Sequence, residues 1–393
     1  MEALKKKAIY IHSDNYLDYH FHDGHPFNQK RLSLTKDLLE KMNHLRPEQI
    51  MAPKMASDHE LILAHSAPYV EIVKKLSGLS NKELAMEKTA LHYGLGSEDT
   101  PVFNNMHEKA ATIVGGTLLG AELIMEGQAS YVLNLAGGLH HALTSKAAGF
   151  CIYNDCSVAI SYLKEKYHAK VLYIDIDAHH GDGVQWAFYH DPQVFTFSIH
   201  ETGRYLFPGT GHITERGDGE GYGYSLNLPI DAFTQDESWL SCFEEALHHV
   251  LQIFKPDIIV SQHGCDAHFH DPLTHLSTSM KTFVKAPTLI KAVADKYCEG
   301  RWLATGGGGY DIWRVVPRAW SILWMVMNDI PVTQQELPKE WLEAWQSVAP
   351  VDLPSHLLDE DDSFPVIPRK QEIEKYNEFI TEKALGYIKN QMK

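Results

Sequence analysis

The chain alternates short apolar runs with longer segments in which apolar residues recur every three or four positions. The short runs are rich in β-branched and aromatic residues, which is typical of strands, and the longer segments have the spacing of amphipathic helices. In residues 31–45, for example, Leu32, Leu38 and Leu39 fall on one face of a helix. The predicted strands are residues 8–12, 131–135, 171–176, 194–199, 225–228, 258–262 and 302–305. The predicted helices are residues 31–45, two short helices within 58–76, and residues 104–126, 155–167, 236–254, 279–298 and 311–328.

Strands that alternate with helices of this length favour an α/β fold, with a mostly parallel sheet covered by helices on both faces. In such a fold, sites form beyond the carboxyl ends of the strands. We predict a single α/β domain over residues 1–346. Residues 347–393 are predicted to be an acidic, proline-rich linker followed by a C-terminal helix, which packs on the domain or lies at an oligomer contact.

The composition narrows the classes of protein that fit the sequence. Lys+Arg 35 against Asp+Glu 51 gives the 393 residues a net charge of −16, which disfavours binding to nucleic acid or to anionic membranes. The five cysteines are scattered and form no CxxC pair, which indicates a reducing compartment. The N-terminus shows no apolar signal region, and the apolar run at residues 320–327 is too short to cross a bilayer. We therefore expect a cytoplasmic protein.

The richest chemistry follows the strand predicted at residues 171–176. Alternate residues of a strand share a face, so Asp175 and Asp177 point the same way, and His179 follows as the chain leaves the sheet. A divalent cation held by Asp177 and His179 would offset the cost of burying two carboxylates. The alternative interpretation is that the two aspartates cap the next helix and that His179 lies in a solvated loop.

A third metal ligand is predicted after another strand. Asp266 follows the strand at residues 258–262, and it would complete a set with Asp177 and His179. Three protein ligands and an open position are typical of a catalytic zinc site. Other ligand sets stay open, because histidines cluster in the same region: His263, His268, His270 and His275.

Further side chains suit acid–base chemistry beside such an ion. His140 and His141 lie in a glycine-bounded turn after the strand at residues 131–135, and a histidine pair can act as general base and general acid near neutral pH. Asp175 and Asp182 are candidates for the carboxylates that orient the two imidazoles. Tyr310 follows four glycines, and its hydroxyl could donate to a developing oxyanion.

Taken in order, the motifs GGLHHA with GFCIYNDC, DIDAHHGDG, FPGTG, GCDAHFHDPL and GGGGY resemble those of the zinc-dependent histone deacetylase family. The segment HPFNQKR and Leu139 are similar to the bacterial branch of acetoin-utilization deacetylases. The resemblance covers roughly residues 8–325. It implies the arginase/deacetylase α/β fold, with an eight-stranded and mostly parallel sheet, and an enzyme that hydrolyses N-acetyl-lysine amides on proteins to acetate and free lysine.

The resemblance also implies a role for each matched residue. Zinc would be held by Asp177, His179 and Asp266, with Fe²⁺ as an alternative because availability decides between such ions. The general base and acid would be His141 with Asp182, the electrostatic partner would be His140 with Asp175, and Tyr310 would polarise the amide carbonyl.

Substrate-binding residues are carried over in the same way. Gly149, Phe150 and Phe207 match a narrow tunnel for the acyl-lysine stem. Asp99 matches an acid at the tunnel rim, although the alignment could slip onto Glu98.

Two further sites rest on the resemblance alone. Arg31 matches a residue of the internal cavity through which acetate leaves. A structural K⁺ would be held by Ser198 together with the carbonyl groups of Asp175, Asp177, His179 and Ile199.

Other functions fit the same motifs. An acetylpolyamine amidohydrolase would use the same site on a small cation, and a non-catalytic acetyl-lysine binding module would keep the tunnel but lose a catalytic group. An arginase-like ureohydrolase would need further aspartate ligands that the sequence lacks. The expected partner is acetylated lysine on a protein, an acyl-CoA synthetase being suggested by the acetoin-utilization likeness. The oligomeric state is left open.

Overall fold

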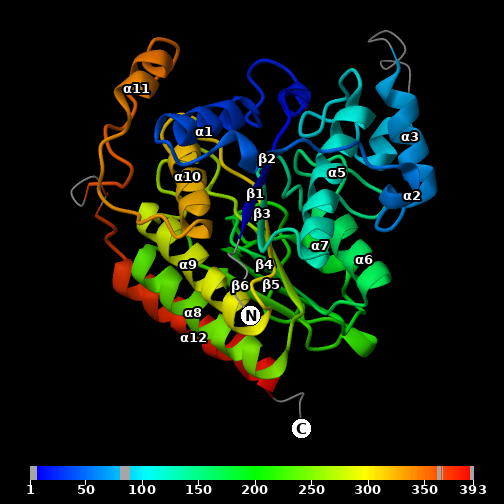
Figure 1. Ribbon diagram of the computed structural model, residues 1–393. Helices are drawn as coiled ribbons and strands as arrows, with labels where there is room; N and C mark the ends of the chain where they lie inside the picture. Colours follow the sequence, from blue (N-terminus) through cyan, green and yellow to red (C-terminus); the bar gives the residue numbers. More distant parts are fainter. Residues whose placement is uncertain (1–6, 80–88, 361–363, 365, 390–393) are drawn as a thin grey trace, which may run out of the picture.

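The computed structural model describes residues 7–79, 89–360, 364 and 366–389. Within this part of the chain, eight strands form one all-parallel sheet in the order β2-β1-β3-β8-β7-β4-β5-β6 (Figure 1). The strands are β1 (Ala8–Ile11), β2 (Ile50–Met51), β3 (Tyr131–Asn134), β4 (Val171–Asp175), β5 (Val194–Glu201), β6 (Ser225–Ile230), β7 (Ile258–Gln262) and β8 (Trp302–Thr305).

The predicted α/β fold with a parallel sheet is confirmed, and each of the seven predicted strands is present. Strand β2 was not predicted; it has two half-buried residues and lies at the edge of the sheet. Two residues are too few to show an alternating pattern, so β2 is recognised from its pairing with β1, where Tyr10 is opposite Ile50.

The helices lie on both faces of the sheet (Figure 1). They are α1 (Lys30–Lys41), α2 (Asp58–Leu61), α3 (Ala67–Ser77), α5 (Met106–Met125), α6 (Asp155–Tyr167), α7 (Asp182–Ala187), α8 (Asp236–Ile253), α9 (Met280–Tyr297), α10 (Val316–Met327), α11 (Lys339–Gln346) and α12 (Lys370–Lys389). The pattern did not predict α7 and α11, which are short. The helix predicted from residue 311 begins at Val316, because turns occupy residues 312–315.

Strand β4 shows why the sheet is covered twice. All five of its residues are buried. Val171 and Tyr173 belong to the apolar cluster that includes residues of α5 and α6, whereas Leu172 and Ile174 belong to the larger cluster on the opposite face. A strand that is buried on both faces has apolar residues at consecutive positions, as residues 171–174 of β4 do.

The strand register brings polar residues to one edge of the sheet. Asp175, the last residue of β4, is paired with Ser198 of β5 and with Gln262 of β7. Gln262 is paired in turn with Thr305 of β8. The carboxyl ends of β4, β7 and β8 therefore lie at the same level, next to Ser198 of β5, and the loops that follow these strands meet there.

The C-terminal helix α12 packs beside α8 and strand β6, which is the edge strand of the sheet (Figure 1). The buried amide of Asn377 fixes this contact. It accepts a hydrogen bond from the backbone N–H of Asp231 at 2.9 Å and donates to Thr234 at 2.8 Å and to Ser238 at 3.0 Å. α12 thus covers an edge that would otherwise be open to pairing with another chain. No helix in the described ranges is long and apolar enough to cross a membrane.

The segment before α12 is held by one buried carboxylate. Asp359 accepts hydrogen bonds from Arg318 at 2.9 Å, from His268 at 3.1 Å and from the backbone N–H of Met280 at 2.7 Å. The side chains of Asp359 and Arg318 are only 8% and 3% exposed. This ion pair joins the predicted linker to α9 and α10.

Replacement of Asp359 by Asn should lower the free energy of unfolding by about 3 kcal/mol, because it leaves the buried guanidinium of Arg318 without its counter-charge. Glu360→Gln is the matched control: the Glu360 side chain is 61% exposed, so its loss should change stability by less than about 0.5 kcal/mol. Denaturant unfolding of both variants measures the difference, and equal midpoints would show that the buried pair adds nothing.

Candidate metal centre and active site

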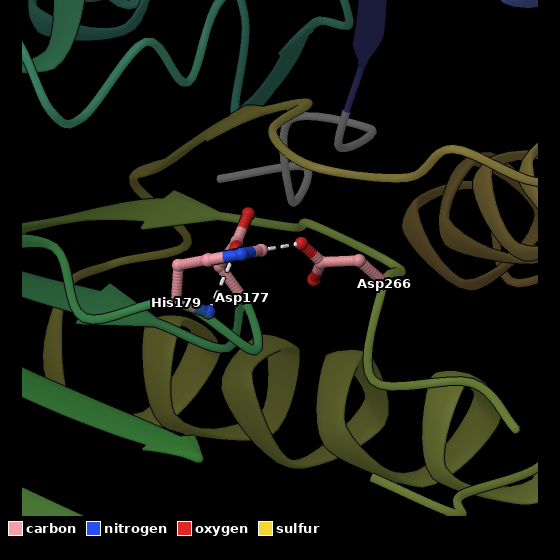
Figure 2. A group of neighbouring side chains, drawn as sticks. All are labelled: Asp177, His179 and Asp266. Atoms are coloured by element: carbon pink, nitrogen blue, oxygen red, sulfur yellow. Dashed lines mark hydrogen bonds and ion pairs between the residues drawn. The ribbon is translucent and has the colours of Figure 1, made fainter. Parts of the chain in front are cut away.

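Asp177, His179 and Asp266 converge beyond the carboxyl ends of β4 and β7 (Figure 2). The Nδ1 atom of His179 lies 2.8 Å from Oδ2 of Asp266 and 3.1 Å from Oδ1 of Asp177. All three residues are buried, and they are the one group among the described residues with the geometry to hold a metal ion. The structure therefore brings together the three ligands that the sequence predicted.

The remaining carboxylate oxygens are held by donors of the protein. Oδ2 of Asp177 accepts from the backbone N–H of Gly308 at 2.7 Å and from the side chain of Gln262 at 2.6 Å. Oδ1 of Asp266 accepts from the backbone N–H of Ala178 at 2.8 Å. These bonds orient both carboxylates toward His179.

Two glycines leave the space that the ligands need. A Cβ atom on Gly308 would lie 2.2 Å from Oδ2 of Asp266, and one on Gly264 would lie 2.0 Å from Oδ2 of Asp177. Any side chain at either position would displace a carboxylate. Gly308 of the GGGGY segment and Gly264 of the HGCD segment therefore allow the backbone to lie close to the three candidate ligands.

The charges in this group fit a divalent cation. Burial alone would lower the pKa of His179, but its hydrogen bonds with Asp177 and Asp266 outweigh burial and raise that pKa well above the ordinary value. Two buried carboxylates therefore demand a positive charge between them. One imidazole nitrogen and two carboxylate oxygens are a donor set that suits Zn²⁺ or Fe²⁺, with further positions open to substrate and water.

The alternative interpretations of these residues are wrong. Neither Asp175 nor Asp177 caps the following helix, because α7 begins at Asp182 after Gly181 and has no side-chain cap.

The other histidines of this region lie outside the group that could hold a metal ion among the described residues, and they make contacts of their own. His263 contacts the hydroxyl of Ser261, His268 contacts Asp359, His275 contacts Glu201, and the backbone N–H of His270 donates to His268.

His140 and His141 form a pair beside this group, and each ring has its own carboxylate. Nδ1 of His140 lies 2.8 Å from Asp175, and Nδ1 of His141 lies 2.7 Å from Asp182. Their Nε2 atoms are 3.0 Å apart. Tyr173 adds a hydroxyl that donates to Asp175 at 2.6 Å. Each imidazole is therefore fixed in orientation through its Nδ1 atom.

The two imidazoles have different protonation equilibria. Burial opposes protonation of His140, but the charges of Asp175 and Asp177 outweigh it and raise the pKa to about 9. Burial and the charge of His140 lower the pKa of His141 in spite of Asp182. At neutral pH, His140 is the cation and His141 is the neutral ring that can accept a proton.

Tyr310 and two phenylalanines border the histidines. The Tyr310 ring lies 6.4 Å from that of His179 and 5.8 Å from that of Phe150, and Phe207 lies 4.9 Å from His141. Burial, followed by the charges of Asp266 and Asp177, raises the pKa of Tyr310 well above its usual value, so the phenol keeps its proton. The protonated phenol can donate a hydrogen bond at neutral pH.

The loop between the histidines and Phe150 has no room for a side chain at Gly149. A Cβ atom there would lie 2.3 Å from the His141 ring and 2.9 Å from Phe207, and the residue has φ +51°. The exposed Asp99 accepts a hydrogen bond from the backbone N–H of Gly149 at 2.9 Å. Asp99, rather than the neighbouring Glu98, is therefore the acid that contacts this loop.

Arg31 lies behind the glycine loop and is fully buried. Its Nη1 atom donates to the carbonyl groups of Gly307 at 2.9 Å and Gly309 at 3.1 Å. The guanidinium lies 4.4 Å from the centre of the Phe27 ring and 4.9 Å from the Trp320 ring. Its Nη2 atom has no hydrogen-bond partner among the described residues. A buried cation with a free donor can receive a small anion.

The residues predicted to hold K⁺ lie on neighbouring strands. Ser198 and Ile199 belong to β5, and Ser198 is paired with Asp175 of β4. Asp177 and His179 belong to the segment that follows β4. The Ser198 hydroxyl is 2.8 Å from Nδ1 of His200.

Sequence reasoning missed some supporting residues. Gln262 donates a hydrogen bond to Asp177, one of the candidate metal ligands, and Asp271 accepts a hydrogen bond from the backbone N–H of Tyr310 at 2.8 Å. Gln262 ends a strand, as Asp175 does, so its position at a strand end was a usable signal. No pattern in the sequence singles out Asp271, because its partner lies 39 residues away.

Comparison with known proteins agrees with this geometry. The family model described as "Histone deacetylase domain" matches residues 25–327, and the chain therefore belongs to the histone deacetylase family. The acetoin utilization protein AcuC of Bacillus subtilis (strain 168) is 52% identical, over 98% of each chain. The protein of the same name from Staphylococcus aureus (strain MRSA252) is 47% identical, over 96% of each chain. The predicted likeness to the acetoin-utilization branch is confirmed.

Solved structures show the same fold. A structure described as an HDAC homolog complexed with SAHA matches with a TM-score of 0.83 and 30% identity, over 97% of this chain and 100% of that one. An HDAC homolog from Aquifex aeolicus matches with a TM-score of 0.82 and 29% identity, over 95% of this chain and 100% of that one. The predicted arginase/deacetylase fold with its eight-stranded sheet is thereby confirmed.

Replacement of Asp266 by Asn should weaken the binding of Zn²⁺ at least about tenfold, since even the loss of a residue that only supports a ligand has an effect of this size. Gln262→Ala should show the smaller effect expected of a supporting residue. Titration with Zn²⁺ and a competing chelator measures both, with the exposed Asp218→Asn as control. Affinity unchanged in Asp266→Asn would exclude Asp266 as a ligand.

Proposed function

We propose that the protein is a metal-dependent lysine deacetylase, which hydrolyses N-acetyl-lysine amides on proteins and releases acetate and free lysine. One observation carries the proposal. Two histidines, each hydrogen-bonded to its own carboxylate, lie on the Asp-His-Asp ligand group, and the ring of Tyr310 lies beside His179 of the same group. Amide hydrolysis needs these functions together: a base for water, an acid for the amine, and donors for the oxyanion.

We further propose Zn²⁺ as the metal held by Asp177, His179 and Asp266, with Fe²⁺ as the alternative in the cell. Once bound, such a cation polarises a carbonyl group and lowers the pKa of a water ligand. We also propose a structural K⁺, held by Ser198 and by the carbonyl groups of Asp175, Asp177, His179 and Ile199. Its role would be to fix the segment after β4 that carries two of the metal ligands.

The protein side chains then divide the proton transfers. His141 is neutral, and it accepts the proton of the attacking water while Asp182 stabilises the imidazolium that forms. His140 carries a positive charge that favours the developing oxyanion, and Tyr310 donates a hydrogen bond to the same oxygen. His141 next gives its proton to the departing ε-amine. The products are acetate and the free lysine side chain.

Substrate binding follows from the groups around the histidines. The rings of Phe150 and Phe207 offer apolar walls to the aliphatic stem of a lysine, and Gly149 keeps the space between them open. Asp99, which accepts a hydrogen bond from the backbone N–H of Gly149, would orient the substrate backbone at the rim. Arg31, with its free Nη2 donor, would receive acetate behind the glycine loop.

Substrate and location complete the proposal. The name of the Bacillus subtilis relative concerns acetoin utilization, which favours an acetylated acyl-CoA synthetase as the protein substrate. The five cysteines are free and buried, which fits the cytoplasm, and the net charge of −16 argues against nucleic-acid or membrane partners.

The purified protein should release acetate from an acetyl-lysine peptide of an acyl-CoA synthetase faster than from acetylspermidine. Turnover should be lost after chelation and restored by Zn²⁺. Faster hydrolysis of acetylspermidine would make the protein an acetylpolyamine amidohydrolase with the same mechanism. Peptide binding without turnover of either substrate, with the metal bound, would contradict the enzyme and indicate a binding module.

Replacement of Tyr310 by Phe should reduce kcat about 100-fold, because it removes one donor to the oxyanion. The ring contact with Phe150 and the metal content should stay as in the wild-type protein. Tyr205→Phe, an exposed tyrosine, is the matched control and should leave kcat unchanged. Steady-state kinetics with metal analysis tests the assignment, and full activity in Tyr310→Phe would exclude the role in oxyanion binding.

A further inference from the structure

The turn that carries His140 and His141 is held from behind by two adjacent residues at the start of α6. Asn154 is the N-cap of this helix and Asp155 is its first residue. Both are buried, with relative exposures of 1% and 0%. Neither is a ligand of the metal group, and neither contacts a reacting atom.

Asp155 binds the backbone before the histidines. Its carboxylate accepts hydrogen bonds from the backbone N–H groups of Gly138 at 3.0 Å and Leu139 at 2.9 Å, and from the hydroxyl of Thr117 at 2.6 Å. Burial raises the pKa of Asp155, and these hydrogen bonds oppose that rise. The carboxylate fixes the entry of the chain into the turn.

Asn154 binds the backbone around His141. Its Nδ2 atom donates to the carbonyl groups of His140 at 3.2 Å and Ala142 at 3.0 Å. Its Oδ1 atom accepts from the backbone N–H of Ser157 at 2.9 Å. The Nδ2 atom faces only hydrogen-bond acceptors and the Oδ1 atom faces a donor, so the orientation of the amide is determined. One side chain thus joins the helix start to the peptides on either side of the base.

A third buried residue completes the arrangement. Nε2 of His65 accepts from the backbone N–H of Asn154 at 2.9 Å, and Nδ1 donates to the carbonyl group of Leu143 at 3.1 Å. These two bonds require the neutral ring, and burial lowers the pKa of His65 to about 4. His65 therefore ties the start of α6 to the far end of the same turn.

We propose that Asn154 is a positioning residue for the general base, and that its two donor bonds hold the His141 imidazole in line with Asp182. The inference rests on the proposed function, since it assigns a role in the same reaction. A carbonyl group shifted at residue 140 or 142 would rotate the ring that lies between them. A misplacement of about 1 Å in such a group can cost about 100-fold in rate.

The competing explanation is that Asn154 only caps α6. Asp and Ser are caps as good as Asn, so under this explanation Asn154→Asp and Asn154→Ser would keep full activity. If Asn154 positions His141, both variants should lose activity. Asn154→Asp keeps the acceptor for Ser157 but turns an oxygen toward two carbonyl oxygens, and Asn154→Ser removes both donors without adding charge.

The test measures both variants beside Ser279→Ala, which removes the cap of α9 far from the histidines in the sequence. We expect kcat for the acetyl-lysine peptide to fall roughly 10- to 100-fold in the two Asn154 variants. KM and bound Zn²⁺ should stay within about twofold of wild type. Ser279→Ala should keep its kcat, although it loses a helix cap.

A second readout does not depend on catalysis. The proton between Nδ1 of His141 and Asp182 should give a downfield proton resonance, which we expect to shift or broaden in Asn154→Ser. Wild-type kcat and an unchanged resonance in Asn154→Ser would overturn the inference. If the wild-type protein hydrolyses no acyl substrate, the proposed function fails, and the resonance alone decides whether Asn154 positions His141.

Discussion

The candidate active site is organised around the electrostatic repulsion between two buried carboxylates. Asp177 and Asp266 bring two carboxylates against one imidazole in a buried position, where two like charges without a counter-ion are costly. A cation between them would remove that cost, so the binding of a metal would be coupled to the stability of the site. The donors of Gly308, Gln262 and Ala178 hold the carboxylates in this arrangement before any ion arrives.

The parallel sheet makes this concentration of charge possible. The ends of β4, β7 and β8 lie at one level, so loops from distant parts of the sequence meet over a rigid edge. Asp177 and Asp266 are far apart in the chain but follow neighbouring strands. Apolar clusters on both faces of the sheet keep the strands in register, and the chemistry can therefore be placed on loops without loss of precision.

The two histidines show how one residue type performs two tasks. The rings are adjacent, but His140 lies closer to the charges of Asp175 and Asp177, whereas His141 lies beside the cationic His140. The neighbouring charges separate their pKa values, and the proposed mechanism uses this separation, with His140 as the charged ring and His141 as the base. The backbone of the turn sets these distances, which is why the residues behind it matter to the chemistry.

The sequence alone predicted seven of the strands, the fold class and the three residues that the structure brings together as a candidate metal group, because each prediction depends on local pattern: apolar runs of a given length, followed by Asp, His and Gly at the strand ends. It did not reveal β2, the support of Asp177 by Gln262, the turn contacts of Asn154 or the anchor at Asp359. These depend on pairs 12 to 91 residues apart, or on a strand of two residues. Only the tertiary structure brings such pairs together, since a hydrogen bond across the fold leaves no periodic trace in the chain.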